Sequence, residues 1–353
     1  MRANPFDVVH ADAIEFIADL GPDALIVAND PPWSAVSTAL AARGVTPSRV
    51  IIAGSMEESA LIATCDAQPE SDGHGDRNHR GESAPCVVGI GGGTAVDTAK
   101  YLGWRLELPI ILIPTIASVD ATFTDAVGVR RDRKVTYVGK IRPREVVIDL
   151  PLITSAPARL NRAGIGDILS CHTGLFDWQL AVAAGQGVPW DAELGELGRT
   201  LLAELAEAAA DIRATSQVGV GFLLDAYRRI GAACAAAGHS RFEEGSEHFL
   251  GYAIEEVTGE HYVHGELIAM GVVAMSVIQG NDPQAAAAIV HAAGTVAHPE
   301  AIGLDRATVV DSILRLGRYV TAEGLDPCVA TLEDISAEDA ERAWQAITAL
   351  PRA

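Results

Sequence analysis

The sequence predicts an α/β domain with a doubly wound, mainly parallel sheet, followed by an all-α domain. Short apolar runs alternate with helical patterns through residues 1–150, as expected of strands joined by crossover helices. Across 151–353 the pattern becomes almost wholly helical from Leu152 onward. A chain of 353 residues is longer than one hydrophobic core usually supports, so we expect two domains that meet near Pro151.

The first domain is expected to contain four buried strands in order. They are the runs DALIVAND, SRVIIAG, PCVVGIGGG and PIILIPT, at residues 23–30, 48–54, 85–93 and 109–115. The run TAVDTAKYLGWRL predicts a helix between the last two strands, and residues 126–148 predict a hairpin and a return strand. The polar, Gly-rich run ESDGHGDRNHRGES, which contains His74 and His79, predicts a mobile surface loop.

Charge and cysteine content exclude several classes of protein. A formal net charge of -21 disfavours nucleic acid and anionic membrane surfaces as partners, because both repel an acidic protein. The five widely spaced cysteines argue against a disulfide framework and for a reducing compartment. The N-terminal residues lack the apolar core of a signal peptide, and no stretch is long enough to span a bilayer. We expect a cytoplasmic protein.

Three glycines, Gly91, Gly92 and Gly93, lie between the third strand and the following helix, in GIGGGTAVDTAK. Glycines there allow the backbone to approach a pyrophosphate, and the helix N-terminus supplies oriented N–H groups. The spacing is not the Gly-x-Gly-x-x-Gly fingerprint, which disfavours an ordinary Rossmann dehydrogenase. A purely structural strand-to-helix turn is the alternative.

A second set of chemical residues lies in the helical half. Asp167 follows a Gly-Ile-Gly turn in NRAGIGDILSCHTGLFDW, where we expect a long helix to begin. His248 lies in EEGSEHFLGYAIEE and His264 in EHYVHGELIAMG. One carboxylate and two imidazoles from separate helices form the ligand set of an open metal site. Alternatively, the aspartate is a helix cap and the histidines are ordinary surface or core residues.

Four motifs in order resemble the superfamily of iron-containing alcohol dehydrogenases, glycerol dehydrogenases and dehydroquinate synthases. They are GIGGGTAVDTAK, PTIASVDATFTDA, APARLNRAGIGDILS and GSEHFLGYAIEEVTGEHYVHGELIAMGVVAM, which together span roughly residues 85–275. The third is similar to the metal-aspartate segment of glycerol and glycerol-1-phosphate dehydrogenases. The resemblance implies a dehydroquinate synthase-like fold with a Rossmann-like NAD-binding domain and a helical domain for metal and substrate.

The resemblance implies that Asp167, His248 and His264 bind one divalent metal. Zinc fits this ligand set and needs no redox change, while iron or nickel are alternatives. Such a metal polarises the oxygen of an alcohol or ketone and favours hydride transfer.

The same resemblance assigns residues to the cofactor and the substrate. The implied cofactor-binding residues are Gly91, Gly92, Gly93, Asp97, Thr115 and Ser118. Asp120 matches an acidic position beside the substrate, with a turn-capping aspartate as the alternative. His261 matches a histidine near the metal and is a candidate proton relay, unless it simply faces solvent.

Asp30 ends the first predicted strand, in the run AND-PPW. A carboxylate there can accept hydrogen bonds from the ribose hydroxyls of the cofactor and would repel a 2′-phosphate. The residue resembles the family position that favours NAD, so we expect NAD rather than NADP.

Two reaction types share this scaffold. A dehydrogenase interconverts an alcohol and its ketone, whereas a dehydroquinate synthase-like cyclase eliminates phosphate and closes a ring. The cyclase's Gly-Gly-Lys-Thr-Gly run is replaced here by ATFTDAVGVR, and the metal carboxylate lies in AGIGD. These departures favour the dehydrogenase. A catalytically silent binding homologue is a third possibility, against which the complete ligand set argues.

The substrate is expected to be a small polyol or polyol phosphate, such as glycerol 1-phosphate and dihydroxyacetone phosphate. Residues 130–144 carry seven of the chain's 26 lysines and arginines, a cluster suited to a phosphate group. A solvated hairpin or a subunit contact is the alternative for this segment. Self-association into a homo-oligomer is also expected.

Overall fold

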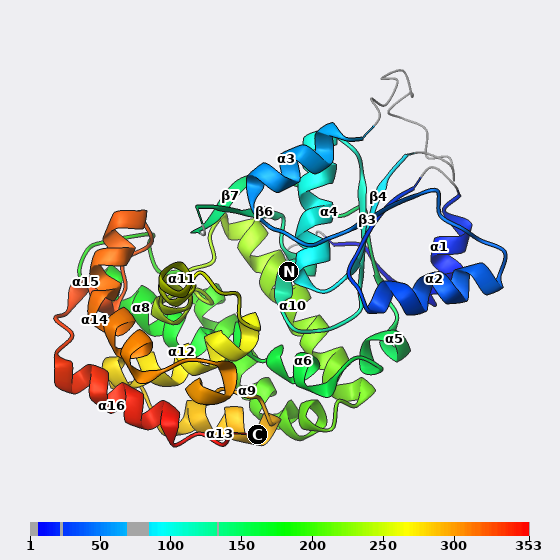
Figure 1. The fold of residues 1–353 in the computed structure, drawn as a ribbon. Coiled ribbons are helices and arrows are strands. Elements are labelled where there is room, and N and C mark those ends of the chain that lie inside the picture. The colour runs from blue at the N-terminus through cyan, green and yellow to red at the C-terminus, as the bar shows by residue number, and fades with distance from the viewer. Residues whose placement is uncertain (1–5, 22–23, 69–84, 133, 353) are drawn as a thin grey trace. The chain divides into compact units, whose positions relative to one another are not determined.

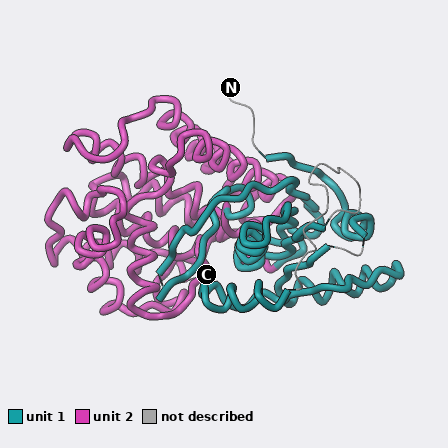
Figure 2. The backbone as a smooth tube through the Cα atoms, turned by 90° about the horizontal axis from the view of Figure 1, so that it is seen from above, with its two compact units in different colours: residues 1–116, 121–156 teal, residues 117–120, 157–353 magenta. Residues whose placement is uncertain are grey.

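The computed structural model describes residues 6–21, 24–68, 85–132 and 134–352. The chain forms two compact units, coloured separately in Figure 2. The first comprises residues 1–116 and 121–156, and the second comprises residues 117–120 and 157–353. The predicted loop at ESDGHGDRNHRGES, with His74 and His79, lies outside the described residues.

A sheet of six parallel strands forms the centre of the first unit (Figure 1). Its spatial order is β1-β8-β5-β4-β2-β3. The strands are β1 (Val8–His10), β2 (Leu25–Ala28), β3 (Arg49–Ile52), β4 (Val87–Gly91), β5 (Ile110–Pro114) and β8 (Glu145–Ile148). Every residue of β2, β4 and β5 is buried, which explains why these strands are continuous apolar runs rather than alternating ones.

Four helices lie between consecutive strands of the sheet, and a fifth follows the last strand. They are α1 (Ala13–Asp19), α2 (Pro32–Ala42), α3 (Glu58–Asp66), α4 (Gly93–Leu106) and α5 (Leu150–Thr154). Side chains of α1 and α2 pack with those of β2, β4 and β5 in one apolar core, through residues such as Ile17, Leu40, Ile90 and Ile113. An antiparallel hairpin of β6 (Ala126–Arg131) and β7 (Lys134–Lys140) completes the unit.

The order in which strands are added to the sheet reverses between β2 and β4. The connection from β2 leads outward to the edge strand β3, whereas β4 lies on the other side of β2 and leads on to β5. Carboxyl ends of parallel strands at such a reversal form the usual ligand-binding crevice of doubly wound sheets. Asn29 and Asp30 follow β2 at this edge, and the glycine turn follows β4.

The second unit is helical. It contains α6 (Ala158–Ala163), α7 (Gly166–Leu169), α8 (Cys171–Ala183), α9 (Ala192–Arg213), α10 (Gln217–Ala237), α11 (Ser246–Thr258), α12 (His264–Gln279), α13 (Pro283–Ala293), α14 (Arg306–Glu323), α15 (Val329–Leu332) and α16 (Ala337–Thr348). Short 3₁₀ turns occur at Asp120–Phe123 and Pro299–Ile302. Helix α12 is buried along most of its length and packs against α7, α11, α13 and α16.

The predicted fold class is confirmed, with two differences in detail. The sequence prediction missed β1, because three partly exposed residues carry no measurable periodicity. The long helix expected at Asp167 is wrong, because the chain divides at Ser170 into α7 and α8. The Ser170 hydroxyl donates to the carbonyl of Asp167 at 2.9 Å, a local bond that competes with regular helical bonding.

No helix in the described part of the chain combines the length and apolarity needed to cross a membrane. The assignment of cofactor binding to residues 1–150 and metal binding to residues 151–353 stays a prediction.

Candidate metal centre and cofactor loop

The glycine turn after β4 has no space for side chains. Gly91 has a φ of +150°, and a Cβ there would lie 2.5 Å from Asn29 Oδ1. A Cβ on Gly92 would lie 2.7 Å from Ile116 Cδ1. Gly93 starts α4, a helix of 14 residues whose first amides receive no capping side chain. The turn therefore places bare backbone and the N-terminus of α4 at the carboxyl edge of the sheet, an arrangement suited to binding an anion.

Asn29 shapes this turn from the neighbouring strand. Its Oδ1 accepts the Gly92 N–H at 3.2 Å, and its Nδ2 lies 3.5 Å from the carbonyl of Ala53. The sequence analysis did not single out Asn29, although its position at the end of β2, directly before Asp30, was an available signal.

Thr115 is the other polar residue at this turn. Its N–H donates to the Gly91 carbonyl at 3.0 Å, so its place is fixed by backbone. Its side chain is buried, yet Oγ1 has no hydrogen-bond partner among the described residues. A buried hydroxyl without a partner is uncommon and fits a site completed by a ligand.

Two other predicted cofactor residues have protein partners. Asp97 Oδ1 lies 3.6 Å from the ammonium of Lys100, a fully buried lysine that also donates to Thr124 at 2.6 Å. Asp30 is exposed at the end of β2 and accepts a hydrogen bond from Ser34 at 2.9 Å. Asp30 thus follows the carboxyl end of β2, whereas Asp97 lies on α4 in an ion pair.

Residues 117–120, which include Ser118 and Asp120, are held against the helical unit. The Ala117 N–H donates to Asn161 Oδ1 at 2.8 Å, and the Tyr227 hydroxyl lies 3.1 Å from the Ala117 carbonyl. A Cβ on Gly164 would lie 1.9 Å from that same carbonyl. The first glycine of the AGIGD motif is therefore required by a close backbone contact.

Asp167, His248 and His264 form one cluster, as the sequence predicts. Each contributes a ligand atom, and these atoms lie within 4.8 Å of one another. Asp167 Oδ1 is 3.2 Å from His264 Nε2 and 3.9 Å from His248 Nε2. Asp167 and His248 are buried, whereas His264 is partly exposed.

The two oxygens of Asp167 have different partners. Oδ2 accepts the N–H of Asp120 at 2.8 Å. Oδ1 is buried and makes no hydrogen bond with any described residue, although it faces two imidazole nitrogens. Helix α7 has no capping side chain, so Asp167 is not the helix cap that was the alternative. A carboxylate oxygen left open between two imidazoles fits a divalent metal.

The cluster attracts positive charge. Burial opposes a charge on His248, but the hydrogen bond to Glu247 and the charges of Glu247, Glu244 and Asp167 raise its pKa to about 10. Burial also opposes the charge on Asp167, yet His264, His248 and the Asp120 amide lower its pKa. A metal cation would take the place of the proton that this site otherwise favours.

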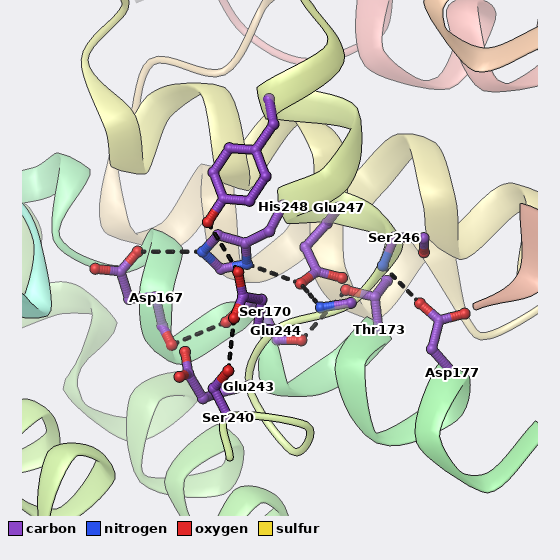
Figure 3. A network of polar contacts seen from close by, with 12 residues as sticks. Asp167, Ser170, Thr173, Asp177, Ser240, Glu243, Glu244, Ser246, Glu247 and His248 are labelled. Carbon is purple, nitrogen blue, oxygen red and sulfur yellow. Dashed lines mark hydrogen bonds and ion pairs between the residues drawn. The ribbon is translucent and has the colours of Figure 1, made fainter. Parts of the chain in front are cut away.

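Further carboxylates surround the cluster. Glu243 is buried, and its pKa is raised well above the usual value by burial and by the charge of Asp120. Figure 3 shows Asp167 and Glu247 on opposite sides of the His248 ring. The sequence analysis did not single out Glu247, although the residue precedes His248 in the GSEH motif.

His261 does not join the cluster. Its side chain is 60% exposed, and its Nδ1 lies 4.0 Å from a carboxylate oxygen of Glu255. Its role as a proton relay stays a prediction.

The basic segment 130–144 is partly neutralised within the first unit. Arg131 pairs with Glu58, Lys140 lies 3.3 Å from Asp125, and Arg144 lies 3.1 Å from Glu145. These pairs favour the solvated hairpin over a phosphate site.

Comparison with known proteins gives consistent results. The sequence model of the iron-containing alcohol dehydrogenase family matches residues 35–157. A glycerol-1-phosphate dehydrogenase [NAD(P)+] of Methanococcoides burtonii is 30% identical over 72% of this chain and 73% of its own. The same enzyme of Cenarchaeum symbiosum is 31% identical over 73% of this chain and 71% of its own. The chain therefore belongs to the iron-containing alcohol dehydrogenase family.

Solved structures show the same fold. A probable glycerol dehydrogenase of Sinorhizobium meliloti superposes with a TM-score of 0.70 at 21% identity, covering 98% of this chain and 97% of that chain. Glycerol dehydrogenase of Schizosaccharomyces pombe superposes with a TM-score of 0.68 at 19% identity, covering 98% and 88%.

Proposed function

We propose that the chain is a metal-dependent, NAD(H)-linked dehydrogenase that interconverts a small polyol or polyol phosphate and its ketone. The observation that carries this proposal is the open Oδ1 of Asp167 between His248 and His264. The glycine turn and the relatives named NAD(P)-dependent glycerol-1-phosphate dehydrogenases support it.

Asp167, His248 and His264 would hold the metal. A divalent ion held there acts as a Lewis acid on the hydroxyl or carbonyl oxygen of the substrate. Zinc suits one carboxylate and two imidazoles and leaves a coordination position open, and iron or nickel are the alternatives. The Asp120 N–H donates to Oδ2, which leaves Oδ1, the oxygen nearer the two imidazoles, as the expected ligand atom.

The backbone of Gly91, Gly92 and Gly93 would carry the cofactor's pyrophosphate at the start of α4. Thr115 and Ser118 would line the cofactor side with their hydroxyls, while Asp120 would lie beside the substrate. Asp97 forms an ion pair with Lys100, and it would contribute to cofactor binding through the conformation of α4.

Asp30 would select NAD over NADP, since its exposed carboxylate would repel a 2′-phosphate. We expect Asp30→Ser to reduce the preference for NADH over NADPH by about tenfold, in line with the loss of one charge repulsion. Steady-state kinetics with both cofactors measure the change. An enzyme that prefers NADPH, and keeps that preference in the variant, would contradict this assignment.

The substrate pair is proposed to be glycerol 1-phosphate and dihydroxyacetone phosphate, as the names of the curated relatives suggest. The test is NADH oxidation with dihydroxyacetone phosphate against unphosphorylated dihydroxyacetone. We expect a kcat/KM at least about tenfold higher for the phosphate ester, the value of one charge-assisted contact. Equal and weak activity on both compounds would remove the phosphorylated substrate from the proposal.

All five cysteines are free, which supports the proposed cytoplasmic location. A homo-oligomer stays a prediction.

A further inference from the structure

Glu247 is a fully buried carboxylate directly beside a metal-ligand candidate. Its Oε1 lies 2.9 Å from His248 Nδ1 and also accepts the N–H of Gly245 at 2.7 Å. The His248 ring is its only ion-pair partner in the described part of the chain. Burying a carboxylate costs free energy unless the group is paired, so the contact of Glu247 with His248 requires an explanation.

The geometry of the ring supplies that reason. His248 directs Nε2 toward Asp167 Oδ1, at 3.9 Å, while Nδ1 faces Glu247 on the opposite side (Figure 3). A nitrogen that binds a metal carries no proton, so Nδ1 must carry the ring's proton and donate it to an acceptor. Glu247 Oε1 is that acceptor.

We infer that Glu247 is a positioning residue, which fixes the tautomer and the orientation of His248 for metal binding. The inference rests on the proposed metal site and names a residue that acts through a ligand rather than as one. Carboxylates in this position also increase the basicity of the ligating imidazole.

Neighbouring contacts hold Glu247 itself in place. The Ser246 N–H donates to Asp177 Oδ2 at 2.7 Å, and the Val329 N–H donates to Asp177 Oδ1 at 2.7 Å. Asp177 on α8 thereby ties the start of α11 to the start of α15. On the other side, a Cβ on Gly271 would lie 2.8 Å from the Glu247 carbonyl, so α12 packs closely against this backbone.

The other histidine offers a matched contrast. Glu266 follows His264 by two residues in the first turn of α12 and is as buried as Glu247. Its oxygens accept from the Arg159 guanidinium at 2.6 Å and 2.8 Å. Glu266 is thus a glutamate that is as buried as Glu247 and also close in sequence to a candidate ligand, but its partner is an arginine rather than the histidine.

The experiment compares zinc affinity in four full-length proteins: wild type, Glu247→Ala, Glu247→Gln and Glu266→Gln. Each is loaded with zinc, and the dissociation constant is measured by competition with a chromophoric chelator. We expect Glu247→Ala to weaken zinc binding by about 10- to 100-fold, the usual effect of losing a carboxylate behind a ligating histidine. Glu247→Gln keeps an oxygen acceptor for Nδ1–H and should restore affinity to within about tenfold of wild type.

The matched control separates positioning from general stability. Glu266→Gln removes the charge of a buried carboxylate paired with a half-exposed arginine and should lower the melting temperature, yet leave the zinc affinity within about threefold of wild type, since no ligand loses its partner. If Glu247→Ala does not fold, Glu247→Met replaces it, because methionine has similar length and no carboxylate.

Two results would overturn the inference alone. One is an Ala or Met variant that binds zinc as tightly as Glu266→Gln, and the other is a Gln variant that loses as much affinity as the Ala or Met variant. A wild-type chain that binds neither zinc, iron nor nickel would instead overturn the proposed function, and the role of Glu247 with it.

Discussion

At the residue scale, the two carboxylate oxygens of Asp167 have different functions: one makes a structural hydrogen bond, and the other faces the two histidines of the candidate metal cluster. Oδ2 accepts the Asp120 N–H and so ties the segment 117–120 to α7. Oδ1 stays open toward His248 and His264. One side chain therefore belongs to the candidate metal cluster and also holds the segment on which the proposed substrate residue Asp120 lies.

For Thr115 we predict that a substitution weakens NADH binding without lowering the stability of the folded protein. Its buried Oγ1 has no partner among the described residues, so Thr115→Val removes no hydrogen bond from the folded protein. We expect the melting temperature without cofactor to stay equal or rise. The dissociation constant for NADH should increase roughly three- to tenfold, the value of one hydrogen bond. Calorimetric titration and thermal unfolding measure the two quantities, and unchanged NADH affinity would show that Thr115 does not contact the cofactor.

Asp177 gives a prediction about pH. Burial and the charge of Glu247 raise its pKa from 3.8 to about 6, against the hydrogen bonds from Ser246 and Val329. Between these values the folded protein holds a proton that the unfolded chain has released, so the free energy of unfolding falls as pH rises through this window. The full effect is at most roughly 3 kcal/mol.

Urea unfolding from pH 4 to 7 measures this dependence, with Asp177→Asn as the control that cannot ionise. We expect the difference in unfolding free energy between wild type and variant to change across the window and to level off only as the pH approaches about 7. A difference that is constant with pH would show that Asp177 titrates normally.

The sequence was sufficient for some residues of the site and not for others. Asp167, His248 and His264 lie in motifs that carry their own chemical meaning, and the structure brings these three together. The roles of Glu247 and Thr115 depend instead on which atoms lack or find partners, and a motif does not contain that information. The ion pair of Asp97 with Lys100 is different, because the two residues are three apart on a predicted helix and their contact could have been predicted from the sequence.

At the element scale, the metal cluster depends on the close packing of α7 against α12. A Cβ on Gly166 would lie 2.6 Å from Gly265 Cα, and a Cβ on Gly265 would lie 1.9 Å from the Ala163 carbonyl. Gly166 immediately precedes Asp167, and Gly265 immediately follows His264. Close backbone approach thus explains the glycines of the AGIGD and HGE motifs and brings two ligand candidates together.

Gly265→Ala should therefore act on both stability and metal binding. The added methyl group meets backbone that cannot give way, so we expect a loss of roughly 1–3 kcal/mol in unfolding free energy and a weaker zinc affinity. The control is Gly221→Ala on α10, where a Cβ would meet nothing within 4 Å. That variant should gain up to about 1 kcal/mol from helix propensity and bind zinc normally. Normal zinc affinity in Gly265→Ala would show that the contact does not position the ligands.

Periodicity predicted most elements but not their interruptions. The buried strands β2, β4 and β5 were predictable because parallel strands covered on both faces are continuous apolar runs. The division at Ser170 was not, because helix-forming residues continue on both sides of it. Strand β1 has only three residues and depends on its pairing with β8.

At the scale of the whole molecule, the acidic charge of -21 and the acidic surroundings of the cluster favour a bound cation. Asp167 and Glu247 are buried beside the imidazoles that contact them, and a divalent ion at the candidate site would add further positive charge there. Catalysis is therefore proposed to depend on the metal. Cofactor binding at the glycine turn of the first unit is not expected to depend on it.

The most direct measurement is the metal content and NADH-dependent turnover of the purified wild type beside Asp167→Ala. The account predicts one divalent ion per chain in the wild type, activity that a chelator removes and zinc or iron restores, and neither metal nor turnover in the variant. NADH should still raise the variant's melting temperature, because the cofactor turn lies in the other unit. A variant that retains both metal and turnover would contradict the account.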